Sequence, residues 1–218
     1  KVIASTGSPL TDESFKYVYE NIKEDVHLTS IAGGTDMVGC LVLGNLYSAV
    51  YKGEIQGQSL GIDVDVFTDD GISTKDGEKG ELVVKQPFPS MPVKFWGDDD
   101  GEKYHKAYFT RFKNIWHHGD FIERTTNNGF IMRGRSDTTL NPGGVRIGTS
   151  EIYQQVENID FITEGLVVGQ NYNDDIRIVL FIKTKDDKEI DEEKIKLIKL
   201  KIKKNCSPKH VPSIIIKV

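Results

Sequence analysis

The order of its apolar runs is the feature that most constrains how this chain can fold. A short apolar run at residues 2–5 ends in a glycine–proline turn, and apolar residues at helical spacing follow between positions 12 and 22. A second strand-like run occupies residues 26–31. Strand, turn, helix and strand in this order predict an α/β sheet, whose ligands usually gather at the carboxyl ends of the strands.

The pattern changes from Leu60 onward, where apolar residues alternate with small or acidic ones. Residues 81–85 form another strand-like run after a turn rich in glycine and aspartate, and residues 130–132 form one more. Alternation of this kind predicts an antiparallel β region.

After Asp137 the pattern changes again. A glycine-rich turn is followed by an expected helix at 149–158, strands at 164–168 and 176–183, and a lysine-rich helix at 191–205. We expect Thr149 to cap the first helix. The sequence therefore predicts an α/β and α+β fold in two domains, residues 1–136 and 137–218.

Composition excludes several classes of protein. The net charge of −5 gives no general attraction to nucleic acid or to an anionic membrane. No apolar run approaches the roughly 20 residues that span a bilayer. Two widely spaced cysteines favour a reducing, cytosolic setting. Because the chain starts and stops within strand-like runs, we expect it to be an internal fragment.

The stretch from Trp116 to Ile152 combines glycines with paired charges, as a polar ligand site would require. Asp120 can accept hydrogen bonds from a vicinal diol, and Arg135 and Arg146 can bind phosphate or carboxylate oxygens. A surface ion pair of Arg135 with Asp137, and a simple hairpin turn at residues 142–146, are the plain structural alternatives.

A second candidate site follows the strand-like run at 26–31. The glycines predict a turn over residues 32–36, in which Thr35 and Asp36 could hold a phosphate and a magnesium ion. Such a pattern more often indicates a simple turn in which Asp36 caps the next segment.

Other polar and aromatic groups are better explained by packing. His117 and His118 are adjacent, so on a strand they face opposite sides and cannot readily share a metal ion. The lysines between 194 and 204 alternate with isoleucines at helical spacing, which is typical of a solvated helix face. A cluster of aromatic residues indicates a short helix packed on the β region: Tyr104, Tyr108, Phe109 and Phe112.

In this order, the motifs resemble those of the adenylate-forming acyl-CoA synthetase superfamily. The resemblance runs along nearly the whole chain, through Thr6-Gly7-Ser8-Pro9, Gly34-Thr35-Asp36, Gly80-Glu81-Leu82-Val83, His118-Gly119-Asp120 and Gly134-Arg135-Ser136-Asp137. It implies that residues 1–136 are the C-terminal portion of a large AMP-binding domain, an α/β sheet with a β-barrel-like part. Residues 137–218 would be part of a small, mobile α+β domain.

The resemblance also implies a reaction. The loops at 87–92 and 140–149 are most similar to those of members that activate acetoacetate, so we expect a ligase that joins acetoacetate to CoA through an acyl-adenylate. The expected cosubstrates are ATP, Mg²⁺ and CoA, with no nucleic-acid partner and no membrane insertion. Acetate or propionate as the acid, a non-catalytic nucleotide-binding module and a plain interaction domain are the alternatives.

The implied roles fall on the residues that match the motifs. Gly33 would leave room for a longer acyl group, and Gly34 belongs to the phosphate turn. The other implied roles are Gly7, Ser8 and Pro9 beside adenine, Thr35 at the α-phosphate, Asp36 at the metal, Asp120 at the ribose, Arg135 at ribose or phosphate, Asp137 as the hinge, Gly144 at the pantetheine tunnel and Arg146 at the phosphates during adenylation.

Two departures from the family pattern affect these expectations. Asp36 stands where glutamate is common, and its shorter side chain changes the reach toward a metal. The chain also contains neither a glycine-rich phosphate loop ending in lysine nor a C-terminal glycine–lysine motif. We therefore expect these 218 residues alone to be inactive.

Overall fold

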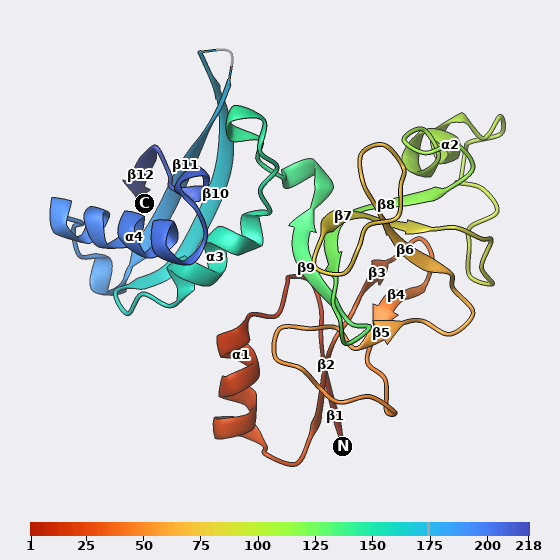
Figure 1. Ribbon diagram of the computed structural model, residues 1–218, viewed down its shortest axis with the longest axis horizontal. Helices are drawn as coiled ribbons and strands as arrows, with labels where there is room; N and C mark the ends of the chain where they lie inside the picture. Colours follow the sequence, from red (N-terminus) through yellow and green to blue (C-terminus); the bar gives the residue numbers. More distant parts are fainter. Residues whose placement is uncertain (174) are drawn as a thin grey trace. The chain divides into compact units, whose positions relative to one another are not determined.

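A computed structural model describes residues 1–173 and 175–218. The chain forms two compact units, residues 1–132 and 133–218 (Figure 1). Each unit has its own apolar core. The helical segments are α1 (Asp12–Tyr17), a π-helical turn (Val18–Ile22), α2 (Glu102–Tyr108), α3 (Thr149–Glu157), α4 (Glu192–Asn205) and 3₁₀ turns at Ser136–Thr138, Pro142–Gly144, Lys185–Asp187 and Pro208–His210. The strands are β1 (Val2–Ser5), β2 (His27–Ser30), β3 (Ala32–Gly34), β4 (Gly39–Leu43), β5 (Gly57–Gln58), β6 (Val64–Phe67), β7 (Lys79–Val84), β8 (Trp116–Arg124), β9 (Phe130–Arg135), β10 (Ile162–Tyr172), β11 (Asp175–Thr184) and β12 (Ile214–Lys217).

The predicted strand–helix–strand unit is present at the amino terminus. Strands β1 and β2 pair in parallel, with Ser5 opposite Ser30, and α1 lies beside them (Figure 1). Helix α1 begins after Thr11, whose hydroxyl accepts a hydrogen bond from the Ser14 amide at 3.3 Å. Parallel pairing places the carboxyl ends of both strands at one edge of the sheet.

The helical pattern at 12–22 needs one correction. The helix changes to a π-helical turn from Val18 onward, and the Lys23 amide donates to the Val18 carbonyl at 2.9 Å. A π turn holds more residues than an α turn, which rotates the positions that follow it. Phe15 precedes the π turn and is buried as expected. Ile22, expected on the same apolar face, is rotated away and is 58% exposed.

The expected glycine turn after β2 also needs correction. Ala32, Gly33 and Gly34 form the short strand β3, which pairs antiparallel with β4, and the turn itself starts at Thr35. The reason is steric, because glycine lets the β4 backbone approach more closely than a side chain would allow.

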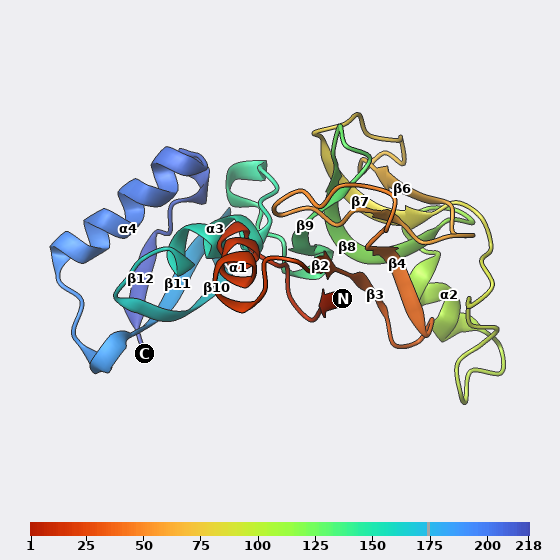
Figure 2. The same cartoon turned by 90° about the horizontal axis from the view of Figure 1, so that it is seen from below.

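An antiparallel sheet follows, as the alternation from Leu60 predicts. Its strands lie in the order β6-β7-β8-β9 (Figure 2). Val66, Leu82 and Ile122 are fully buried on its core side. Helix α2 packs against β8 through Tyr104 and Tyr108, so the short helix expected from the aromatic residues is confirmed for these two, whereas Phe109 and Phe112 follow the helix.

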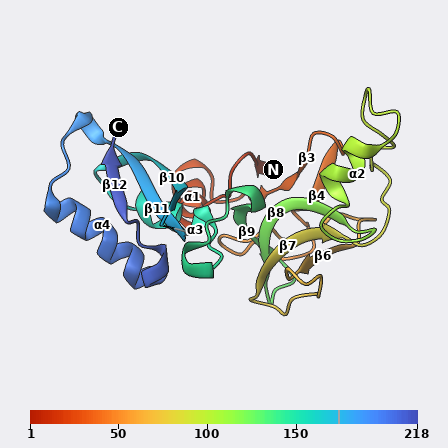
Figure 3. The ribbon, with the colours of Figure 1, turned by 90° about the horizontal axis from the view of Figure 1, so that it is seen from above.

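The second unit is built on the sheet β10-β11-β12, with β10 antiparallel and β12 parallel to β11. Helices α3 and α4 cover the same face of this sheet (Figure 3), and the core contains Ile152 and Val156 of α3 with Ile198 and Ile202 of α4. None of the α4 lysines is buried: Lys196, Lys203 and Lys204 are exposed, and the other three are half-buried. Asp191 caps this helix through the Lys194 amide at 2.8 Å.

The N-cap of helix α3 lies one position earlier than predicted, because Thr149 is already the first residue of the helix. Its N-cap is Gly148, whose amide donates to the Glu151 carboxylate at 3.1 Å. A side chain at position 148 would meet the Arg133 backbone, which accounts for glycine there. Within the described residues, no helix is long and apolar enough to cross a membrane.

Candidate functional site

The carboxyl ends of the parallel strands bring two candidate turns together. The Ile31 amide donates to the Ser5 carbonyl at 3.0 Å, so the segment after β2 runs beside the end of β1. Gly7 follows β1 with φ +91°, a conformation that favours glycine, and both Gly7 and Ser8 are exposed, whereas Pro9 is half-buried. Residues 6–9 and 31–36 therefore border the same sheet edge.

Gly33 packs against the backbone of the neighbouring strand. A Cβ at this position would lie 2.5 Å from the Cα of Cys40 and would collide with the Gly39 carbonyl oxygen. The absence of a side chain at Gly33 is thus required by the pairing of β3 with β4. The room for an acyl group that the resemblance implies would come in addition to this structural requirement.

Gly33→Ala is expected to destabilise the first unit by about 1–3 kcal/mol, because an added methyl group must displace backbone atoms. Urea unfolding followed by tryptophan fluorescence measures the loss, since Trp96 and Trp116 are the two tryptophans of the chain and both lie in this unit. Gly57→Ala is the matched control, because a Cβ at position 57 has no neighbour within 4 Å. Equal unfolding midpoints for the two variants would contradict the steric explanation.

The turn after β3 lies against strand β8. A Cβ at Gly34 would come 3.2 Å from Cε1 of His118 and would collide with the Asp36 carboxylate. Thr35 and Asp36 are exposed, whereas His118 is buried. Residues more than 80 positions apart in sequence are therefore neighbours at the end of β3.

The His118 imidazole is oriented by groups on its own strand. Trp116 donates from Nε1 to His118 Nδ1 at 3.2 Å, which places the remaining ring proton of a neutral imidazole on Nε2. That nitrogen lies 3.7 Å from Oδ2 of Asp120, and both side chains are largely buried. The structure thus brings Asp36, His118 and Asp120 into one polar region.

Tyr104 of α2 is a member of this region that sequence reasoning assigned only to packing. Its ring packs against Trp116 and Phe109, as expected for the aromatic cluster. Its hydroxyl is buried and has no hydrogen-bond partner within the described residues. Burial and the negative charge of Asp36 both raise the pKa of Tyr104, so the group stays a donor. The sequence offers no signal for this proximity.

His117 points to the other side of β8, as its adjacency to His118 predicts. Its Nε2 lies 2.7 Å from the Glu81 carboxylate, which is fully buried and also lies 3.3 Å from the Arg111 guanidinium. Glu81 belongs to the Gly80–Val83 motif, so this motif has a structural role in joining β7 to β8.

The other candidate residues lie in the second unit. Asp137 is in the 3₁₀ turn Ser136–Thr138, and its carboxylate lies 3.6 Å from Nε of Arg135, with both side chains exposed. Arg146 is half-buried and donates from Nε to the Thr139 hydroxyl at 3.2 Å. The surface ion pair of Arg135 with Asp137 that the sequence allowed is therefore present.

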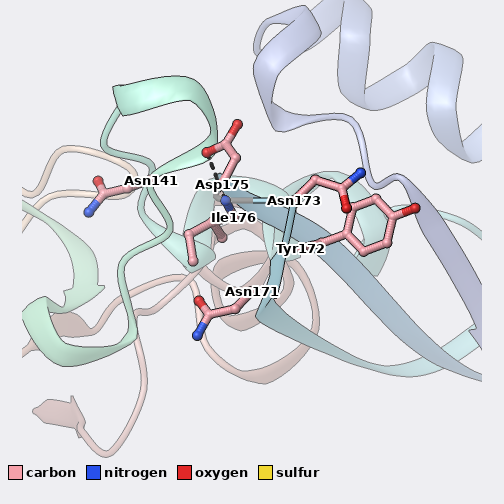
Figure 4. Close-up of a pocket in the computed structure, with 6 residues that line it drawn as sticks. All are labelled: Asn141, Asn171, Tyr172, Asn173, Asp175 and Ile176. Atoms are coloured by element: carbon pink, nitrogen blue, oxygen red, sulfur yellow. Dashed lines mark hydrogen bonds between the residues drawn. The ribbon is translucent and has the colours of Figure 1, made fainter.

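Gly144 is exposed and has φ +76°, and a Cβ there would have no neighbour within 4 Å. Its backbone conformation alone favours glycine. Beside this turn is an open hollow of about 610 Å³ with a mainly polar lining (Figure 4). The residues that line it are Asn141, Asn171, Tyr172, Asn173, Asp175 and Ile176.

Comparison with known proteins gives a consistent result. No family model matches the chain. It is 55% identical over 218 residues to the acetoacetyl-coenzyme A synthetase of Rhizobium meliloti (strain 1021), covering all of this chain and 33% of that protein. It is 45% identical over 216 residues to the acetoacetyl-CoA synthetase of Xenopus tropicalis, covering 98% of this chain and 32% of the relative.

A solved structure shows the same fold. The acetoacetyl-CoA synthetase from Streptomyces lividans superimposes with a TM-score of 0.88 at 37% identity, over 100% of this chain and 33% of that one. The predicted α/β and α+β fold is thereby confirmed. The chain spans about a third of the length of the relatives it matches. Over that third, this chain is similar in sequence and fold to acetoacetyl-CoA synthetases.

Proposed function

We propose that the protein containing this chain is an ATP-dependent acid–CoA ligase that converts acetoacetate, ATP and CoA to acetoacetyl-CoA, AMP and pyrophosphate. The observation that carries the proposal is the identity of 55% to a named acetoacetyl-CoA synthetase over the full chain. The grouping of the Gly34–Asp36 turn with His118 and Asp120 supports it. Residues 1–136 would belong to the AMP-binding domain and residues 137–218 to the mobile C-terminal domain.

In the first step, an acetoacetate oxygen attacks the α-phosphorus of ATP. A carboxyl–phosphate bond forms while the bond to pyrophosphate breaks. The attacking group is already an anion, so positive charge and positioning lower the barrier rather than a proton-abstracting base. Thr35 would contact the α-phosphate, and Arg146 would balance phosphate charge.

The nucleotide would be held by groups from several motifs. Gly7, Ser8 and Pro9 would border the adenine, and Gly33 and Gly34 the acyl and phosphate side. Asp120 would accept hydrogen bonds from the ribose hydroxyls, while Arg135 would contact ribose or phosphate. The exposed backbone at Gly7 would suit contact with the adenine ring, and the buried carboxylate of Asp120 would suit the ribose hydroxyls.

Magnesium fits the residues present. Asp36 offers an exposed carboxylate beside the Thr35 hydroxyl, and hard cations bind oxygen. Within the described residues, no group of three or more His, Cys, Asp or Glu side chains is arranged to hold a metal. Mg²⁺ commonly uses one or two carboxylates together with substrate phosphates and water. Bound there, the ion would neutralise phosphate charge.

In the second step, the CoA thiol attacks the acyl carbon. A carbon–sulfur bond forms, AMP leaves with the electron pair of the broken carbon–oxygen bond, and the thiol proton passes to solvent. Gly144 would line the path of the pantetheine arm, and Asp137 would act as the hinge between the two steps. A reducing cytosolic setting suits the two free cysteines, Cys40 and Cys206.

The full-length protein is expected to catalyse exchange of pyrophosphate into ATP only when acetoacetate is present. Measuring exchange with acetoacetate, acetate and propionate separates the proposed acid from its two closest alternatives. The exchange rate with acetoacetate should exceed the rates with acetate and propionate by about tenfold or more. One or two additional substrate groups typically provide this much discrimination when they fit the acyl pocket. Exchange at one rate with and without acetoacetate would refute the ligase, and faster exchange with acetate would reassign the acid.

A further inference from the structure

The loop that carries Gly144 is closed at its base. Leu140 and Ile147 exchange both backbone hydrogen bonds, at 2.9 and 2.7 Å, and both side chains are buried in the core of the second unit. The base of the loop is therefore held by the fold, whatever happens at its tip.

The tip of the loop has longer hydrogen bonds of its own than the base. Gly143 and Gly144 have φ values of +57° and +76°. The Gly144 and Val145 amides donate to the Asn141 and Pro142 carbonyls at 3.3 Å each, slightly longer than the usual range for such bonds. Because glycine has the greatest backbone freedom, this shape needs support from outside the loop.

Asp175 supplies that support from the first residue of β11. The Gly143 amide donates to both carboxylate oxygens, at 2.9 and 3.0 Å, and the Ile176 amide donates to Oδ1 at 2.7 Å. Figure 4 shows Asp175 where β11 begins, beside the turn that follows Asn141. The bonds from Gly143 and then Ile176 lower the pKa of Asp175, so it is charged at neutral pH.

Lys209 reaches the same turn from the 3₁₀ turn Pro208–His210. A side chain at position 143 would collide with its ammonium group, which therefore lies directly against Gly143. Lys209 also attracts the Asp175 carboxylate. Gly143 thus lies between an anion and a cation supplied by two other segments.

We propose that Asp175, assisted by Lys209, is a positioning residue for the thioester-forming step. It holds Gly143 and Gly144 in the left-handed conformation that leaves the path of the CoA thiol open. This inference rests on the proposed function, in which Gly144 lines that path. Asp175 acts through the loop and takes no part in the bond changes.

The test compares Asp175→Ala and Asp175→Asn with the wild type in the full-length protein. Asp160→Ala is the matched control, because Asp160 is an exposed carboxylate of the same unit. Asp175→Ala is expected to slow transfer to CoA, or to raise KM for CoA, by about tenfold, the usual effect of losing a charge-assisted hydrogen bond. Acetoacetate-dependent pyrophosphate exchange should keep its rate. Asp175→Asn keeps an acceptor oxygen and should restore part of the loss.

Hydrogen exchange of the peptide covering residues 140–147 gives a readout that does not require activity. Exchange there should accelerate in Asp175→Ala and stay at the wild-type rate in Asp160→Ala. Unchanged loop exchange in Asp175→Ala would overturn the proposal, and so would a loosened loop with unchanged transfer to CoA. Equal loss of both half-reactions would show a general folding role instead. A wild-type protein without acetoacetate-dependent exchange would refute the proposed function, while the loop measurement would still report on the contact.

Discussion

Trp116→Ala is expected to lower the free energy of unfolding of the first unit by about 3–5 kcal/mol, the usual cost of deleting a large buried aromatic side chain. Trp116 is 2% exposed, stacks on Tyr108 at 3.6 Å between ring centroids and meets Phe88 edge-on at 5.4 Å. A cavity at this position would remove the contacts that hold α2 on β8. Urea unfolding followed by far-UV circular dichroism measures the change.

Trp96→Ala is the matched control, because the Trp96 side chain is fully exposed at 102%. Its unfolding midpoint should equal that of the wild type. Trp116→Phe separates packing from hydrogen bonding, since it keeps a ring but removes the donor to His118, at a cost of about 1 kcal/mol for that bond. Comparable midpoints for Trp116→Ala and Trp96→Ala would show that the aromatic cluster contributes little to stability.

Asp120→Asn is expected to weaken AMP binding by about 10- to 100-fold. A charge-assisted hydrogen bond contributes roughly 1.5–3 kcal/mol, and each 1.4 kcal/mol is a factor of ten in affinity. The amide keeps the shape of the side chain but loses the charge and one acceptor, so a ribose diol would lose half of its contact. Isothermal titration calorimetry with AMP measures the difference.

The control for this change is Asp70→Asn, which removes the same charge from an exposed loop. Circular dichroism on each variant verifies that the fold is kept. If Asp120→Asn and Asp70→Asn bind AMP equally well, Asp120 does not contact the nucleotide. If the wild type does not bind AMP at all, the nucleotide-binding part of the proposal fails.

Local pattern predicts the regular elements of this fold well. The strand Val2–Ser5 coincides with its prediction, and α4 begins one residue after Asp191, which caps it. The helix after Thr11 begins where the sequence predicts, but from Val18 it continues as a π turn rather than an α-helix. Residue propensity does not distinguish a π turn from an α turn. The expected turn at Ala32–Gly34 is a strand for a similar reason. Its partner β4 is close in sequence, with Gly33 opposite Cys40, but the low strand propensity of glycine favours a turn over a strand at these positions.

The polar regions could be predicted only in part. Asp120 and the Gly34–Asp36 turn were identified from motif order, but their proximity through His118 depends on how β3 and β8 fold. The bonds from Gly143 to Asp175 join positions 32 apart, and no spacing rule indicates them. Tyr104 was assigned to packing, and only the three-dimensional position of its hydroxyl reveals the polar neighbourhood. Contacts between residues this far apart in sequence depend on how the strands are arranged in the fold, and the local pattern of a single sequence does not give that arrangement.

The hydrogen bond from Trp116 to His118 also selects one tautomer of the imidazole. Nδ1 accepts from the indole, so a neutral ring keeps its proton on Nε2, the nitrogen that lies 3.7 Å from Oδ2 of Asp120. Removing the indole donor would remove this selection, and the ring proton would then be free to occupy either nitrogen. The packing of one aromatic side chain therefore sets which atom of the ring the Asp120 carboxylate meets.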